Sequence, residues 1–372
     1  MVVSRQEHQK YNKRRKRMRI WLIALVTVLI LASSAVAYGA YLTNKLKHVT
    51  DSANNELTRG DKSTLRQGKV DPVKDNFSIL FMGIDKRKNE PSRSDALILA
   101  TFNHDTKQVK MVSIPRDSRA QIIDPTHKHQ YGYSKITHAH AYGDTNGGLG
   151  PDYTIATVEN LFRVPVDYYV QIDFQAFVKI IDALGGIKMD VPVKLVTSNS
   201  TDQKGKNAIV LNPGVQTLNG EQALSLVRNR KSPGSGGDFG RGRRQMEMIK
   251  AIVKKSASLS SVTKYGSVID SLHGHIETNL TFGQLLSLRN YAGSLSGIDT
   301  MQLKGTDDYI DGIYYYSLNN SYLQKVRTDL SNQLGITPSE VNANTTTQSD
   351  SGASGNTGGL YPAASGSSNN TK

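Results

Sequence analysis

Short hydrophobic runs alternate with amphipathic stretches through the middle of the chain. The runs are bounded by polar or turn-forming residues, a pattern that predicts β-strands. Other stretches carry apolar residues three and four positions apart, as in Phe174–Leu184 with the stop signal Gly185-Gly186, and these predict helices. The expected strands are Phe77–Met82, Ala96–Phe102, Val109–Ile114, Asp167–Ile172 and Ile187–Val193, and the expected helices are Phe174–Leu184, Asn219–Val227, Arg241–Leu259, Phe282–Leu295 and Leu318–Leu334.

Strands and helices are intermixed from residue 76 to residue 336, which is typical of an α/β fold built in layers. The links between the first three expected strands are short, and short links favour antiparallel neighbours. We therefore predict a single α-β-α layered domain over residues 76–336 with a mixed central sheet.

A membrane segment is expected before this domain. Ile20–Leu42 is 23 residues long without Asp, Glu, Lys or Arg, which is enough to cross a hydrocarbon core of roughly 30 Å. A basic cluster, Lys13–Arg19, precedes it and predicts that residues 1–19 stay in the cytoplasm. The chain is thus predicted to be a single-pass type II membrane protein with an extracytoplasmic domain. The alternative is a signal peptide cleaved near Ala35-Val36-Ala37, but the apolar run continues past that point.

The flanking segments and the charge distribution narrow the function. Residues 43–75 are polar and are expected to form a stalk, and residues 337–372 are expected to be a disordered tail. The net charge is +14, but residues 1–19 hold eight Lys and Arg against one Glu, so half of the excess lies in that short segment. Such a distribution argues against a nucleic-acid partner. The absence of cysteine excludes disulfides and thiolate chemistry.

A first constellation of charged residues is expected at one edge of the sheet. In an antiparallel meander, Asp85 leaves the first strand where Asp95 enters the second, and the third strand delivers Arg116 to the same end. Two facing carboxylates suit Mg²⁺, which usually combines one or two of them with substrate phosphates, and an arginine suits bidentate phosphate binding. The alternative is that these are turn residues with a surface ion pair.

A second, basic constellation follows the helix expected at Asn219–Val227. Arg228 and Arg230 close that helix, and Arg241, Arg244 and Gln245 share one face of the next. Arginines in a first helical turn are unfavourable unless an anion neutralises them, and free N–H groups at a helix start bind phosphate. The alternative is a solvated basic helix.

Other chemistry has weaker support. His127, His129, His138 and His140 are close in sequence, but their spacing matches no known zinc site. The chain has no nucleophile-elbow motif, no P-loop and no dinucleotide-binding fingerprint.

Together these segments resemble the LytR-CpsA-Psr family over residues 76–336. Each matching stretch is short, but their order and spacing are specific. They are Phe81-Met82-Gly83-Ile84-Asp85, Ser92-Arg93-Ser94-Asp95-Ala96, Val112-Ser113-Ile114-Pro115-Arg116-Asp117, Lys135-Ile136-Thr137-His138-Ala139, Ile181-Asp182-Ala183-Leu184-Gly185-Gly186-Ile187, Leu218-Asn219-Gly220-Glu221-Gln222-Ala223-Leu224, Val227-Arg228-Asn229-Arg230 and Asp238-Phe239-Gly240-Arg241 with Arg244-Gln245.

The resemblance implies an activity and a role for each matched residue. Such proteins transfer teichoic acid or capsular polysaccharide from an undecaprenyl-pyrophosphate carrier to peptidoglycan, at the 6-hydroxyl of N-acetylmuramic acid. Asp85 and Asp95 match Mg²⁺-associated aspartates, which with Arg116 form the expected catalytic group. The residues expected around the pyrophosphate are Arg93, Arg116, Lys135, Arg228, Arg230, Arg241, Arg244 and Gln245. Gly242-Arg243 departs from the family pattern within the arginine helix.

Two other functions compete with transfer. A hydrolase that releases polyisoprenyl phosphate would use the same site without an acceptor. A membrane-bound transcriptional regulator is opposed by the predicted topology, which holds the domain away from DNA.

Overall fold

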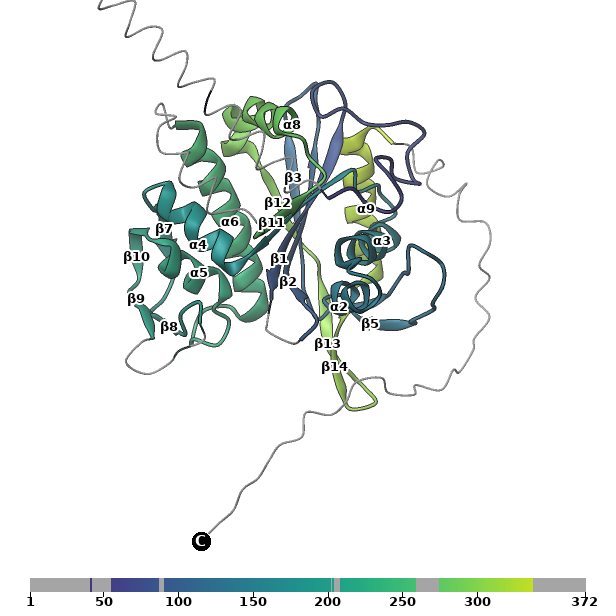
Figure 1. Cartoon of the computed structure of the whole chain (residues 1–372). Coiled ribbons are helices and arrows are strands. Elements are labelled where there is room, and N and C mark those ends of the chain that lie inside the picture. Colours follow the sequence, from purple (N-terminus) through teal and green to yellow (C-terminus); the bar gives the residue numbers. More distant parts are fainter. Residues whose placement is uncertain are drawn as a thin grey trace, which may run out of the picture.

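The computed structural model describes residues 41, 55–86, 90–201, 203, 208–258 and 274–336. Six strands form a central sheet in the order β11-β6-β1-β2-β3-β12 (Figure 1). β1 pairs antiparallel with β2 and parallel with β6, so the sheet is mixed, as predicted. The strand bounds are β1 Phe77–Asp85, β2 Arg93–Phe102, β3 Val109–Ile114, β6 Tyr168–Asp173, β11 Ile276–Thr278 and β12 Asp299–Gln302.

Helices cover both faces of the sheet and make three layers (Figure 1). One face carries α4 (Phe174–Ala183), α5 (Gly220–Arg228) and α6 (Gly237–Ser258). The other carries α2 (His138–Thr145), α3 (Gly150–Phe162) and α9 (Asn320–Leu334). A short helix, α8 (Phe282–Ser287), and a 3₁₀ helix (Leu288–Gly297) lie near the end of the sheet away from the functional site. The α-β-α layering expected from the sequence is confirmed.

The two-residue period of β1 separates two hydrophobic cores. Leu80, Met82 and Ile84 join the core under α3 and α9. Phe77 and Ile79 join the opposite core. On that second face the strand continues through Gly83 to Asp85, so the alternation that builds the core also aims Asp85 toward the α4–α5–α6 side.

Two-stranded sheets lie around the three layers. β7 (Ile187–Val191) pairs with β10 (Gly214–Leu218), and β8 (Leu195–Thr197) pairs with β9 (Ile209–Leu211), beside α4 and α5. β4 (Arg119–Gln121) pairs with β5 (Tyr133–Lys135). β13 (Gly305–Ile310) and β14 (Ile313–Leu318) form a hairpin that projects beyond the sheet (Figure 1).

The expected stalk needs a correction from residue 55 onward, because this part packs on the domain. Arg59 pairs with Glu159 at 2.5 Å and Arg66 pairs with Asp167 at 2.7 Å. Leu57 is buried in the main core. Ion pairs to buried carboxylates and a buried leucine fix residues 55–75 as a strap on the domain, despite their polar composition.

The expected membrane span, residues 20–42, lies outside the described residues except for Tyr41. Among the helices that the structure does describe, none is both long and apolar enough to cross a bilayer. The expected tail, residues 337–372, also lies outside the described part of the chain.

Candidate functional site

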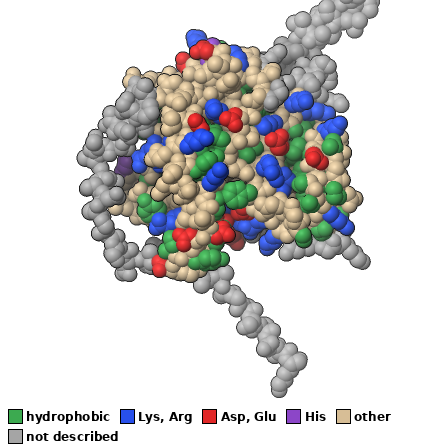
Figure 2. All heavy atoms as spheres, turned by 180° about the vertical axis from the view of Figure 1, so that it is seen from behind, with side chains coloured by type: hydrophobic (Ala, Val, Ile, Leu, Met, Phe, Trp, Pro, Cys, Tyr) green, Lys and Arg blue, Asp and Glu red, His purple; other side chains and the backbone are tan. Residues whose placement is uncertain are grey.

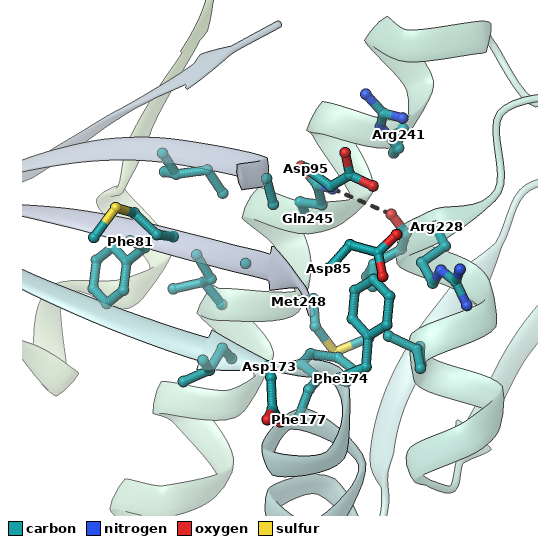
Figure 3. A pocket seen from close by; sticks show the side chains of 18 of the residues that line it. Phe81, Asp85, Asp95, Asp173, Phe174, Phe177, Arg228, Arg241, Gln245 and Met248 are labelled. Carbon is teal, nitrogen blue, oxygen red and sulfur yellow. Dashed lines mark hydrogen bonds between the residues drawn. The ribbon is translucent and has the colours of Figure 1, made fainter. Parts of the chain in front are cut away.

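A cavity of about 320 Å³ lies between the sheet and α4, α5 and α6. Its walls are apolar along most of its length. Phe81 lies at one end of it, Phe174, Phe177 and Met248 lie along it, and charged side chains gather at the other end (Figure 3). The apolar lining residues are Phe81, Met82, Ala96, Ile98, Val170, Ile172, Phe174, Phe177, Leu224, Val227, Met248, Ile249 and Ile252. The sequence could not identify this set, because its members come from three strands and three helices.

The polar end of the cavity, which we call the mouth, brings together both sequence constellations (Figure 3). Strand ends supply the carboxylates, and α5 and α6 supply guanidiniums. Its polar residues are Asp85, Asp95, Arg116, Arg228, Arg230, Arg241 and Gln245. The predicted convergence of strands at one sheet edge is therefore what the structure shows.

A β-bulge directs Asp95 into the mouth. Gly83 faces Ala96, but the next pair is Ile84 with Ser94, so Asp95 is an extra residue in β2. Simple alternation would place Asp95 on the α2 side with Leu97 and Leu99, whereas a bulge re-aims one side chain and raises the local twist. In the bulged strand Asp95 accepts a hydrogen bond from Arg116 Nη1 at 2.8 Å.

Arg116 lies at the centre of the charged cluster. Its Nε is 3.5 Å from Asp117 Oδ2, and its Nη1 bonds Asp95. Burial alone would lower the pKa of Arg116, but Asp95 and then Asp117 outweigh burial and raise that pKa above its ordinary value. The guanidinium therefore stays charged and is held in place from both sides.

α6 presents one continuous face to the cavity. Arg241, Gln245, Met248 and Ile252 follow helical spacing along it, so the helix carries a cation at its start and apolar side chains further along. Arg241 is only 7% exposed, and its Nη2 lies 3.5 Å from Asp238 Oδ1. Burial, and then repulsion from Arg116 against the opposing pull of Asp238, lowers the pKa of Arg241. A buried cation beside another favours an anionic ligand.

The end of α5 supplies the remaining arginines. A capping box at Asn219 and Gln222 starts the helix. At the other end the Arg228 guanidinium stacks 4.4 Å from the centre of the Phe174 ring and donates to Asn199 O at 3.3 Å. Arg230 Nη1 lies 3.8 Å from Asp238 Oδ1. The stacking on Phe174 and the hydrogen bond to Asn199 O orient the guanidinium of Arg228 at the mouth.

A second pocket of about 210 Å³, the side pocket, shares Asp85, Asp95 and Arg116 with the mouth. It holds two more of the cations expected around the pyrophosphate, Arg93 and Lys135. Its complete lining is Asp85, Glu90, Pro91, Arg93, Asp95, Arg116, Asp117, Lys135, Thr137 and His138. Arg93 and Lys135 therefore lie beside the mouth and not within it.

Acidic and basic side chains occur in nearly equal numbers in the side pocket. Lys135 Nζ bonds Asp117 Oδ1 at 3.0 Å. His138 Nδ1 lies 2.9 Å from Ser134 Oγ. Burial, and then the positive charges of Arg93 and Lys135, lower the pKa of His138 to about 4, so the imidazole is neutral at pH 7.

Arg244 is placed differently from the sequence expectation. Its Nε donates to Leu226 O at 2.9 Å, Nη1 to Ser235 O at 2.6 Å, and Nη2 to Asn229 O. The side chain is buried and does not line the cavity. Because three carbonyl oxygens take up its guanidinium, Arg244 fixes the loop that carries Arg230 and is not among the residues that line the mouth.

The four histidines that are close in sequence lie in different environments. His127 and His129 are exposed, and His140 is buried with its Nε2 2.8 Å from Gln171 Oε1. Within the described ranges, no three His, Asp or Glu side chains gather in a way that could hold a metal ion by themselves.

Comparison with known proteins places the chain in context. The model of the LytR_cpsA_psr family matches residues 40–332. The polyisoprenyl-teichoic acid–peptidoglycan teichoic acid transferase TagT of Bacillus subtilis is 39% identical over 340 residues, covering 89% of this chain and 100% of TagT.

Solved structures agree with the sequence comparison. TagT bound to LIIa-WTA matches with a TM-score of 0.62 at 40% identity, covering 76% of this chain and 100% of that one. The same protein with bound octaprenyl pyrophosphate lipid matches with a TM-score of 0.58 at 39% identity and the same coverage.

Proposed function

Because the chain belongs to the LytR-CpsA-Psr family, we propose that it is a transferase that moves a glycopolymer of the teichoic acid type from a polyisoprenyl-pyrophosphate carrier to a hydroxyl of peptidoglycan. One observation carries the proposal. An apolar cavity opens onto a mouth lined by Arg116, Arg228, Arg230 and Arg241. A ligand that fits both parts has a long hydrocarbon chain attached to a strongly anionic group, which describes a polyisoprenyl pyrophosphate.

The mouth suits the pyrophosphate because its cations are fixed before the ligand arrives. Arg116 is held by Asp95, and Arg228 is stacked on Phe174. In the reaction the acceptor hydroxyl oxygen bonds to the phosphorus that carries the glycopolymer. The bond from that phosphorus to the bridging oxygen breaks, and polyisoprenyl phosphate leaves. Negative charge grows on the phosphoryl and leaving oxygens, where preorganised guanidiniums stabilise it.

The carboxylates have two tasks in this proposal. Asp85 and Asp95 both line the mouth and the side pocket, which places each where an incoming hydroxyl could lose its proton. They also form a donor set that suits Mg²⁺, since two carboxylates leave coordination positions for phosphate oxygens and water. When bound, Mg²⁺ would neutralise charge on the pyrophosphate.

The anchor predicted from residues 20–42 completes the proposal. A carrier lipid stays in the membrane. An enzyme tethered to the extracytoplasmic face of that membrane would therefore meet both the carrier and the cell wall. The hydrolase alternative uses the same residues and differs by needing no acceptor.

The proposal is tested by a transfer assay with the full-length chain, a defined lipid-pyrophosphate glycan and peptidoglycan oligomers. Arg116→Ala, Arg228→Ala and Arg241→Ala should each reduce transfer by roughly ten- to hundred-fold, because charge-assisted hydrogen bonds contribute about 1.5–3 kcal/mol each. Arg243→Ala is the matched control, because Arg243 lines a separate groove on another side of α6. Release of polyisoprenyl phosphate without any need for acceptor would favour the hydrolase. Normal transfer in two of the three variants would remove the assignment of the mouth.

A further inference from the structure

We propose that the side pocket and the β13–β14 hairpin beside it bind the acceptor, as a site for the uncharged sugar backbone of peptidoglycan. The inference rests on the proposed transferase function and adds where the second substrate lies. Four independent features of this region lead to it: its position, its charge, its exposed aromatic rings and its acidic residues.

The first feature is the position of the side pocket relative to the cavity. The cavity lies on the α4–α5–α6 side of the sheet, whereas Lys135, Thr137 and His138 of the side pocket come from β5 and the start of α2, which covers the other side. The two spaces meet at Asp85, Asp95 and Arg116. In phosphoryl transfer the attacking and leaving oxygens are roughly in line. If the lipid leaves on the cavity side, the hydroxyl must arrive from the side pocket.

Charge separates the two spaces. The side pocket combines the carboxylates of Asp85, Glu90, Asp95 and Asp117 with the cations of Arg93, Arg116 and Lys135, so it is close to neutral. His138 adds a neutral imidazole. A mixture of hydrogen-bond donors and acceptors without a net positive charge suits sugar hydroxyls, each of which donates and accepts. The mouth, in contrast, is rich in cations and suits the pyrophosphate.

Exposed aromatic rings extend the side pocket outward. The hairpin is attached to the pocket wall, because Tyr316 N donates to Asp117 O at 2.8 Å. Lys135 Nζ lies 5.5 Å from the centre of the Tyr314 ring, and the Tyr309 ring lies 5.6 Å beyond it. Tyr309 is 72% exposed near the tip of the hairpin. Exposed apolar surface of this kind marks a binding surface, and a flat ring can pack on the C–H face of a sugar.

Acidic residues on the same hairpin exclude the other polymer. Asp307 lies on the same face of the hairpin as Tyr309 and Tyr314, Asp311 lies at its turn, and Figure 2 shows acidic and hydrophobic side chains together on the lower lobe where the hairpin projects. A polyanionic teichoic acid would be repelled by these carboxylates, whereas an uncharged glycan would not. The occupant is therefore the acceptor glycan and not the chain of the donor polymer.

The test varies the acceptor while the donor is saturating. In the full-length protein, Tyr309→Ala should raise the KM for a peptidoglycan oligosaccharide about ten-fold and leave kcat at saturating acceptor within about two-fold, because a contact made equally in the ground and transition states changes KM alone. Tyr309→Phe keeps the ring and should restore most of the acceptor affinity. Tyr315→Ala is the control, since alternation along β14 puts Tyr315 on the opposite face of the hairpin from Tyr314.

Each other result overturns the inference. An unchanged acceptor KM in Tyr309→Ala rejects the site, and an equal increase in Tyr315→Ala reduces the effect to folding of the hairpin. A change in the donor KM instead would assign the hairpin to the donor polymer. Calorimetric binding of the oligosaccharide without donor gives a second measurement. If the wild type fails to transfer, the proposed function fails, whereas loss of oligosaccharide binding in Tyr309→Ala still supports the acceptor site.

Discussion

Arg241 and Arg244 show how far a single residue can be assigned from its spacing. They are three positions apart on α6, so the sequence placed both at the phosphate. In the structure Arg241 lines the cavity, whereas Arg244 turns to the end of α5 and the loop after it, where it bonds Leu226 O and Ser235 O. Helical spacing defines a broad face only. Which side chain meets a ligand depends on the loop that packs against that face, and the sequence does not place the loop.

Replacing Arg244 should therefore affect stability more than binding. Arg244→Met keeps the volume but leaves three carbonyl oxygens without their donors, and an unsatisfied buried polar group costs about 1–3 kcal/mol. We expect a loss of about 3 kcal/mol or more in the free energy of unfolding, measured by denaturant titration. Arg243→Met, at a site outside this network, should stay within about 0.5 kcal/mol of the wild type. If Arg244→Met instead has wild-type stability but no longer binds the donor, Arg244 acts in ligand binding at the mouth.

The β1–β2 pair shows the same limit at the level of an element. The sequence predicted that Asp85, Asp95 and Arg116 converge, because short links and alternating runs fix the strand directions. It did not predict the bulge at Asp95, because the pattern around Gly83 and Ala96 fits a regular strand equally well. The bulge follows from pairing between the strands, where Ile84 meets Ser94. Cross-strand pairing cannot be read from one strand alone.

Other elements were missed or misplaced for similar reasons. α2 and α3 were not predicted, since Gly143, Gly147 and Gly148 interrupt the helical pattern around them. The helix expected from Leu318 begins at Asn320, because the residues before it pair as β14. The β13–β14 hairpin is rich in Tyr and Asp and has only a weak hydrophobic period. These elements are specified by tertiary contacts, and the start of α2 supplies His138 to the side pocket.

The ends of β1 and β2 should bind Mg²⁺ mainly together with the substrate. Two carboxylates provide few ligands for an ion that dehydrates reluctantly, and Asp95 already accepts a hydrogen bond from Arg116. Isothermal titration should show little Mg²⁺ binding to the protein alone and clear binding once a polyisoprenyl pyrophosphate is present. In Asp85→Ala or Asp95→Ala the affinity for that lipid should become largely independent of Mg²⁺. If the affinity for the lipid depends on Mg²⁺ as strongly in both variants as in the wild type, these aspartates are turn residues and not Mg²⁺ ligands.

On the scale of the whole molecule, two substrates of different character would reach one charged centre from two sides. The strap of residues 55–75 holds the beginning of the domain through Arg59 and Arg66, on elements away from the mouth. The chain between residue 42 and residue 55 is therefore the connection between the expected anchor and a domain with its own hydrophobic cores. The domain could take a carrier lipid from the membrane only if this connection places the domain on the extracytoplasmic side.

The topology can be tested on the intact chain. Alkaline phosphatase fused after Lys372 should be active, because this reporter folds only outside the cytoplasm and the basic cluster before residue 20 should hold the opposite end inside. Replacing Lys13, Arg14, Arg15, Lys16, Arg17 and Arg19 with Gln, while adding four lysines after Leu42, should invert the charge bias and reduce the activity at least several-fold at equal protein level. Replacing Lys254 and Lys255 of α6, which lie far from the span in sequence, is the control and should leave the reporter active. An inactive wild-type fusion that accumulates normally would place the domain in the cytoplasm, where neither wall nor extracytoplasmic carrier is available, and a regulatory role would then account better for the anchor.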